Sequence, residues 1–172
     1  MIKLDITPNE FDAYYARYID KLSDNSTLLE SFTEGLKNTI HFFNTIPEEK
    51  LHYRYQPEKW NSKEILQHLI DTERIFMYRC FRIARRDSTP LTGFDQNIYV
   101  APSNATHKSL TALLSEFEFN RKNSIQLLNS FSKEDLEFIG NSNGGAMSAR
   151  AAAFVIPGHD IWHQEIIQER YL

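Results

Sequence analysis

The chain has 172 residues, of which 41% are hydrophobic and 24% charged, and its formal net charge at pH 7 is −4. A chain of this length is typical of one globular domain and can bury a core that needs neither a disulfide nor a structural metal. The weak negative charge has no long block of one sign, which argues against nucleic acid as a partner, because phosphate binding needs a concentrated basic face.

The remaining compositional signals indicate a cytoplasmic protein without a membrane partner. The single cysteine, Cys80, permits no internal disulfide, which fits a reducing compartment. The first residues carry acids and lack the apolar core of a signal peptide, and no run approaches the roughly 18 apolar residues of a membrane span. We interpret the densest basic cluster as a solvated helix end: Arg79, Arg82, Arg85 and Arg86.

The first part of the chain reads as helical. Only 6 Gly and 6 Pro occur, and they fall mostly between stretches in which apolar residues recur at helical spacing. A short helix is predicted around residues 11–22, and a long one over about 26–44, which Pro47 ends. Residues 51–59 hold two tyrosines and a proline, so we expect an extended connector there.

A second long helix begins after Asn61. Glu64 stands three residues further on, which is the spacing of a capping box, in which each side chain bonds the other residue's backbone N–H. The apolar stripe then continues to about Arg86. A loop over 91–106 is long for a helical bundle, and long loops often frame functional sites.

Two more helices are predicted in the second half of the chain. One runs from about Thr106 to Ser130, and a polar loop over 140–145 precedes another from near Ser148 to the C-terminus. Four long amphipathic helices predict an all-α fold, a four-helix bundle. We expect a single domain, residues 1–172, with the bundle over 25–172 and a short extra helix in an N-terminal extension, 1–24.

One local rule is broken in the last predicted helix, where Pro157 and Gly158 are adjacent. Proline removes a backbone hydrogen bond and glycine forms helix weakly, so we expect the helix to be kinked or to restart there. A departure of this kind in an otherwise consistent sequence often marks a functional site.

Histidines follow this break directly. His159 and His163 stand four residues apart, on one face of a helix, where both rings can reach one metal ion. His68, beside the apolar stripe of the second helix, is the best third ligand, because facing helices of a bundle build metal sites in its core. Three neutral imidazoles would leave positions open for water or substrate. The alternative is packing, since histidines at this spacing also occur on helices that bind no metal.

The same pair has the spacing of the zinc peptidase motif H-E-x-x-H, with Asp160 in place of the general-base glutamate. Aspartate is one methylene shorter, and only nine residues follow His163, which leaves little chain for a downstream third ligand. These departures argue against a peptidase.

Other polar and aromatic residues keep two interpretations each. Asp71, three residues after His68, either accepts a hydrogen bond from an imidazole and fixes its tautomer, or is a plain exposed carboxylate. Arg121 could hold an anionic part of a substrate, but a snorkelling surface arginine is favoured. We interpret Trp162 and Cys80 as packing residues.

The N-terminal aromatic residues suggest a further class of function, an interaction module. They could cover another subunit or cap the core of the bundle: Phe11, Tyr14, Tyr15 and Tyr18.

From about Leu28 to Leu172 the chain resembles the DinB/YfiT-like superfamily of metal-binding four-helix bundles. The resemblance rests on short motifs in the same order and helical placement. They are Trp60–Leu69, which opens the second helix, Gly93–Asp95 in the long loop, Gly158–His163, and Glu169–Leu172. Pro157 is a departure from the family pattern, which puts the entry of the last helix in question.

The resemblance implies a divalent metal, zinc or nickel, bound by His68, His159 and His163, in a protein that is often a homodimer. Some relatives look like metal-dependent hydrolases and others like transferases of low-molecular-weight thiols. We therefore expect a metal-dependent enzyme that activates water or such a thiol against a small-molecule substrate, with no further catalytic residue assigned. The alternative is a non-catalytic metal- or ligand-binding protein or a stress-related interaction protein.

Overall fold

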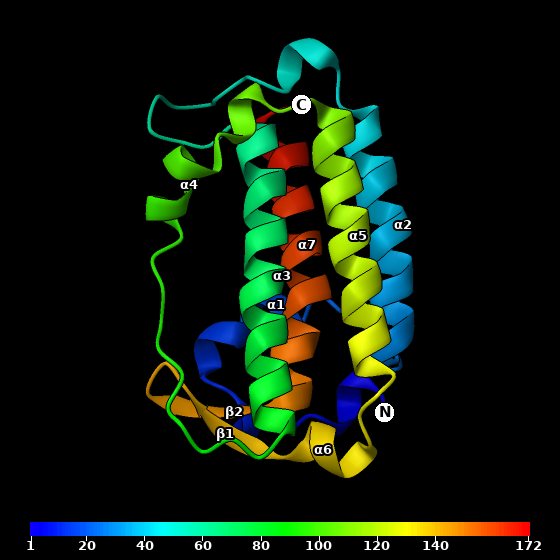
Figure 1. Ribbon diagram of the computed structural model, residues 1–172. Coiled ribbons are helices and arrows are strands. Elements are labelled where there is room, and N and C mark those ends of the chain that lie inside the picture. Colours follow the sequence, from blue (N-terminus) through cyan, green and yellow to red (C-terminus); the bar gives the residue numbers. More distant parts are fainter.

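A computed structural model describes all residues, 1–172, and confirms the all-α four-helix bundle. The long helices are α2 (Leu28–Thr45), α3 (Ser62–Ala84), α5 (Leu110–Leu128) and α7 (Ala149–Arg170). They lie side by side along one axis, as Figure 1 shows. Both α3 and α2 pack against α7 and α5, so the order around the bundle is α3, α7, α2, α5.

Side-chain caps explain where the long helices begin. The predicted capping box of α3 is confirmed, because Asn61 Oδ1 accepts a hydrogen bond from the Glu64 N–H at 3.0 Å and Glu64 Oε2 accepts one from the Asn61 N–H at 2.8 Å. Thr27 caps α2 in the same way, and Ser148 Oγ accepts from the Ala151 N–H at the start of α7. These bonds satisfy N–H groups that a helix leaves without partners.

The predicted N-terminal helix over 11–22 is confirmed only in part. Residues 11–22 contain a 3-10 turn at Ala13–Tyr15 and the single-turn helix α1 (Ala16–Ile19), and two further 3-10 turns, Lys3–Asp5 and Pro8–Glu10, precede them. Asp12 accepts a hydrogen bond from the Tyr14 N–H at 2.8 Å, and such a local side-chain bond favours a turn over a longer helix.

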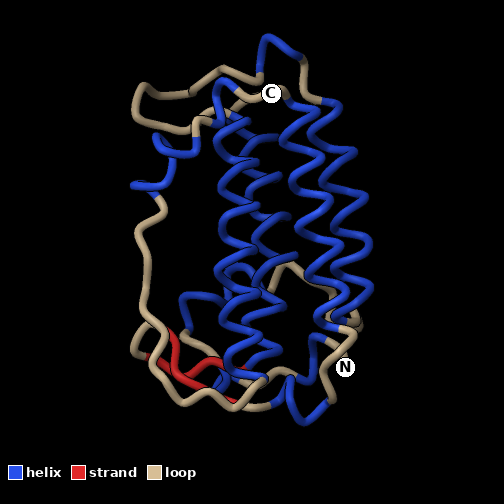
Figure 2. The backbone as a smooth tube through the Cα atoms, viewed as in Figure 1, coloured by secondary structure: helices blue, strands red, loops and turns tan.

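The connections also carry more structure than the sequence predicts. The long loop contains α4 (Asn97–Ser103), and α6 (Lys133–Glu137) follows α5. The polar segment 140–145 is a β-hairpin, in which β1 (Ile139–Ser142) pairs antiparallel with β2 (Gly145–Ser148) at one end of the bundle (Figure 2). Its turn requires positive φ at two successive residues, and these are Asn143 and Gly144, with φ of 54° and 82°.

Helix α7 continues through Pro157, so it does not restart there. The neighbouring glycine has a packing role, because a Cβ on Gly158 would lie 2.0 Å from the backbone carbonyl oxygen of Tyr18. Residues 149–160 are all buried, and this packing offsets the cost of proline within the helix.

Two apolar clusters fill the bundle and are separated by polar residues. The larger cluster lies toward the hairpin and includes Phe32, Phe76, Leu128 and Phe154, and the smaller lies toward the other end and includes Phe43, Leu69, Phe117 and Ile167. Between them, all four long helices contribute to what we call the polar layer: Thr39, His68, Glu73, Arg121, His159, Asp160 and His163. The core is thus interrupted where the candidate ligands lie.

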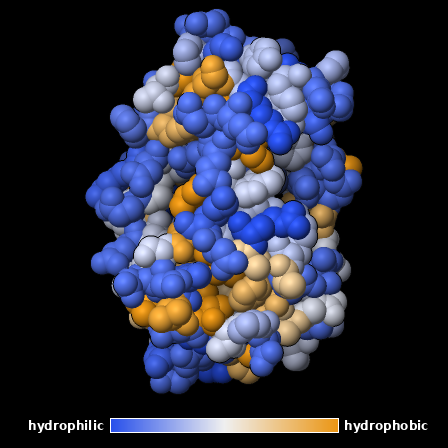
Figure 3. All heavy atoms as spheres, turned by 180° about the vertical axis from the view of Figure 1, so that it is seen from behind, coloured by the Kyte–Doolittle hydropathy of each residue, from blue (hydrophilic) through white to orange (hydrophobic).

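The outer surface is mainly polar. Figure 3 shows the face opposite to that of Figure 1, where hydrophilic residues predominate and apolar ones gather mainly toward the hairpin end. None of the helices is both long and apolar enough to span a bilayer. The cytoplasmic location and the homodimer stay predictions.

Candidate metal centre

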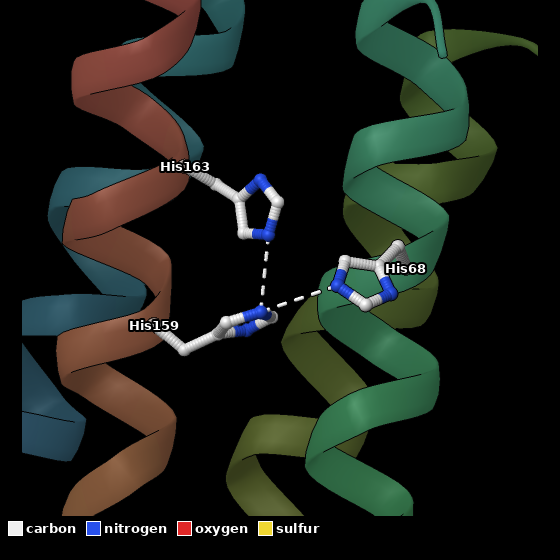
Figure 4. Close-up of side chains that lie close together, drawn as sticks. All are labelled: His68, His159 and His163. Carbon is white, nitrogen blue, oxygen red and sulfur yellow. Dashed lines mark hydrogen bonds between the residues drawn. The ribbon is translucent and has the colours of Figure 1, made fainter. Parts of the chain in front are cut away.

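The three predicted histidines come together between α3 and α7 (Figure 4). His159 Nε2 lies 3.1 Å from His68 Nε2 and 3.0 Å from His163 Nε2. One ligand atom from each ring lies within 4.8 Å of the other two. The helical spacing in α7 and a facing position on α3 therefore produce the convergence that the sequence predicts.

This geometry fits one divalent ion. Nitrogen ligands at about 2.0–2.1 Å in a tetrahedral arrangement lie about 3.3 Å from each other. The distances from His159 Nε2 to the other two rings, 3.0 and 3.1 Å, are close to this value, and the ligand atoms of His68 and His163 lie within 4.8 Å of each other. Three nitrogen lone pairs that face one another repel unless a proton or a cation lies between them. The donor set is thus suited to a metal with at least one position left for a further ligand.

Burial keeps the three imidazoles in the metal-binding form. It lowers the pKa of His68 to about 4, although this ring keeps some contact with solvent. Burial also lowers the pKa values of His159 and His163 well below the usual 6.5, and repulsion from neighbouring imidazoles adds to the effect. All three rings are neutral at pH 7, and a neutral imidazole has a lone pair for a metal.

A hydroxyl orients the His68 ring. His68 Nδ1 lies 3.3 Å from Thr72 Oγ1 and donates to it when Nε2 is the ligand atom. Asp71 does not orient an imidazole, because this carboxylate accepts a hydrogen bond from Gln67 Nε2 and pairs with Arg74, at 3.1 Å in each case. Thr72 takes the position one turn after His68 that the sequence leaves unassigned.

Aromatic rings flank each histidine. Ring centroids lie 5.0 Å apart for Tyr18 and His159, 4.8 Å for Trp60 and His68, and 4.8 Å for Trp162 and His163. The contacts of Tyr18 and Trp162 are edge contacts and that of Trp60 is tilted, and all three hold the imidazoles in place.

The histidines line a cavity of about 510 Å³, which is within the size range of small-molecule sites. Helix α3 contributes one stripe to its wall, at intervals of four, four and three residues: His68, Thr72, Phe76 and Arg79. Trp60, the α7 residues Val155 and Trp162, the N-terminal segment, the loop before α4 and the hairpin form the rest of the wall. Trp162 and the N-terminal tyrosines Tyr14, Tyr15 and Tyr18 thus line this cavity.

A second polar cluster lies on the other side of α7. Arg121 donates from Nε to Glu73 Oε1 at 2.9 Å and from Nη2 to Asp160 Oδ2 at 2.7 Å, and its side chain is 0% exposed. The favoured interpretation of Arg121 as a surface arginine is therefore wrong. Asp160 is bound to Arg121 and is not among the residues that line the cavity, which removes the general base that a peptidase would need.

The sequence does not predict the burial of two charged residues. Glu73 is 0% exposed and holds Arg121, and Arg79 is 2% exposed and lines the cavity, so it does not belong to a solvated helix end. The signal for Arg79 is its spacing from His68, since a separation of 11 residues places both on one face of α3.

Comparisons with known proteins agree with this fold. The sequence profile of the DinB superfamily matches residues 31–167. The structure is similar to YfiT from Bacillus subtilis, described as a probable metal-dependent hydrolase with an unusual four-helix bundle topology. The TM-score is 0.74 at 14% identity, over 95% of this chain and 90% of that one. A search of curated proteins finds no match to the chain.

Proposed function

Because the chain belongs to the DinB superfamily, we propose that it is a metal-dependent enzyme in which His68, His159 and His163 hold one divalent ion, zinc or nickel. The reaction that the site supports best is hydrolysis of a small substrate. The observation that carries this proposal is the convergence of the three histidine ligand atoms in the wall of a cavity. The description of YfiT as a probable metal-dependent hydrolase supports it.

Each component of the site has a defined part in such a reaction. A bound divalent ion lowers the pKa of water or of a thiol and so supplies a nucleophile at neutral pH. The three imidazoles hold the ion without neutralising its charge, and Tyr18 and Trp162 restrict the access of solvent. The cavity beside them positions the substrate.

The shortage of carboxylates in the cavity wall indicates which bonds the site can hydrolyse. Asp12 is the one carboxylate that lines the cavity, and its Oδ1 is occupied by the Tyr14 N–H. Cleavage of a peptide needs a proton donor for the amine leaving group. A site without such a carboxylate favours esters and activated amides, whose leaving groups depart more easily.

Thiol transfer is the second candidate activity, and the size of the cavity favours it. A cavity of about 510 Å³ has room for a small thiol beside an electrophile. The thiol would come from a cosubstrate, because Cys80 is 0% exposed and burial raises its pKa to about 12. The thiol would lose its proton and attack the electrophile, from which the leaving group departs with the bonding electrons.

The decisive assay compares turnover with and without metal. Zinc- and nickel-loaded protein is given p-nitrophenyl acetate and a panel of small esters and amides, and separately cysteine with an alkylating electrophile. We expect turnover that chelation abolishes and that falls at least about 100-fold in His159→Ala.

The matched control is His107→Ala, because His107 is exposed and lies outside the cavity. It should keep full turnover. Equal turnover in His159→Ala and the wild type would contradict the proposal. Metal binding without turnover of any substrate would support the non-catalytic alternative.

A further inference from the structure

One arginine in the cavity wall is buried without a counter-charge. Arg79 is 2% exposed, and its one hydrogen bond runs from Nη2 to the Thr92 carbonyl oxygen at 3.2 Å. Its guanidinium carbon lies 4.8 Å from the ring centroid of Phe76 and 5.7 Å from that of Phe94. Nη1 has no hydrogen-bond partner, and no carboxylate pairs with the side chain.

The other two buried arginines differ from Arg79 in having carboxylate partners, although Nη1 of Arg121 also lacks a hydrogen-bond partner. Arg121 has two carboxylate partners, as described above. Arg150 donates to Glu10 at 2.7 Å and to Glu137 at 3.0 Å. The chain therefore compensates a buried guanidinium wherever it lies within the packed core, and leaves one uncompensated in the wall of the cavity.

An arginine cannot relieve this cost by losing its proton, since the guanidinium stays charged in proteins. A buried unpaired charge is unfavourable until an anion with matching hydrogen bonds approaches it. Ser142 Oγ, in the same cavity wall, is a second buried polar atom without a partner. The free donors of the wall thus include a cationic N–H and a hydroxyl.

We propose that the cavity binds a small organic carboxylate, and that Arg79 and Ser142 bind its carboxylate group. The wall between Arg79 and the histidines is aromatic, since Tyr15 and Phe76 make an edge contact with centroids 5.6 Å apart. His68 and Arg79 are separated by about 16 Å along the axis of α3, at about 1.5 Å per residue. The ligand is therefore elongated, with an anionic end, an apolar middle and, on the basis of the proposed function, its reactive group at the histidines.

The test compares two probes that differ only in charge, 4-phenylbutyrate and its neutral amide. Their affinities for the metal-loaded protein are measured by titration calorimetry. We expect the carboxylate to bind at least about tenfold more tightly, a difference typical of one charge-assisted contact. Arg79→Met should reduce this preference to about twofold or less, and Arg79→Lys should keep a part of it.

Two further variants separate the possible causes. Arg85→Met, on the exposed end of the same helix, should leave the preference unchanged. His159→Ala should also keep it, because the carboxylate group is bound at the other end of the cavity. The comparison of the two probes in the wild type needs no variant, so it stands even where a substitution disturbs folding.

The outcomes distinguish this inference from the proposed function. Equal affinity of the two probes for the wild type, or an unchanged preference in Arg79→Met, would overturn the inference. A preference that is lost only in His159→Ala would assign the carboxylate to the metal, which overturns the role of Arg79 and leaves the proposed function intact. A preference that depends on Arg79 in a protein without metal-dependent turnover would sustain the inference and overturn the proposed function.

Discussion

The two sides of the polar layer differ in whether their buried charges have partners within the protein. On one side Arg121 is enclosed with Glu73 and Asp160, and every charge has a partner within the protein. On the other side the histidines face a cavity whose buried arginine, Arg79, has none. Adjacent residues of α7 serve both sides, because Asp160 is turned by about 100° around the helix from His159. The buried arginine of the structural cluster is paired with carboxylates of the protein, whereas the buried arginine of the candidate site has no such partner.

The greatest loss of stability is expected when the buried cluster of Arg121, Glu73 and Asp160 is disrupted. Arg121→Met leaves Glu73 and Asp160 as two buried carboxylates without a cation, which should lower the free energy of unfolding by about 3–5 kcal/mol. Urea unfolding measures this, with Arg74→Met as a control that removes exposed ion pairs and costs less than about 1 kcal/mol. A loss for Arg121→Met as small as that of the control would show that the cluster is not structural.

The third buried arginine, Arg150, makes the stability of the protein depend on pH through its partner Glu10. Arg150 and other hydrogen-bond donors outweigh the effect of burial and lower the pKa of Glu10 from 4.5 to about 2. A lowered carboxyl pKa contributes stability that is fully present above pH 4.5 and is lost as the pH falls toward 2.

Unfolding followed from pH 6 to pH 2 tests this contribution. Glu10→Gln should be less stable than the wild type at pH 6, and the difference should shrink as the solution becomes acidic. An acid dependence as steep in Glu10→Gln as in the wild type would contradict the assignment.

A smaller loss of stability is expected at the contact between Gly158 of α7 and the backbone of Tyr18. Gly158→Ala places a Cβ 2.0 Å from the Tyr18 carbonyl oxygen, so the N-terminal segment must shift away from α7. Overpacking of this kind costs about 1–3 kcal/mol, measurable by thermal unfolding. Gly145→Ala is the control, since its Cβ would meet only an ordinary contact at 3.9 Å. Equal stability of both variants would mean that the segment does not pack against Gly158.

The smallest effect is predicted for Arg79→Met, which removes a buried charge that has no partner. Its free energy of unfolding should stay within about 1 kcal/mol of the wild type or exceed it, because the removed charge gained no internal compensation. Thermal unfolding of both variants, Arg79→Met and Arg121→Met, measures the difference in their stability. A loss as large as that of Arg121→Met would identify Arg79 as a structural residue.

Local patterns were sufficient to predict the long helices and the convergence of the three histidines. The caps and the apolar stripes are encoded within a few neighbouring residues, as Asn61 and Glu64 show. The histidine set follows from one spacing within α7 and one facing helix. The hairpin turn at Asn143 and Gly144 also had a readable signal, because both residues tolerate positive φ.

The departures from prediction depend on contacts distant in sequence. Arg121 is buried because Glu73 and Asp160, 48 and 39 residues away, reach it from two other helices. Helix α7 continues through Pro157 because its whole circumference is packed there. The spacing of Arg121 from Phe117 and Leu128 places it on the apolar face of α5, but no local pattern identifies the partners that let a charged residue be buried there.

The proposed function depends on the binding of one metal ion by His68, His159 and His163. The metal content of tag-free protein, measured by mass spectrometry after incubation with zinc and with nickel, shows whether they bind it. The wild type and His107→Ala should each carry close to one ion per chain, and His68→Ala, His159→Ala and His163→Ala should each lose it. A wild type that remains free of metal, or single variants that all retain it, would contradict the account and leave the three histidines as packing residues.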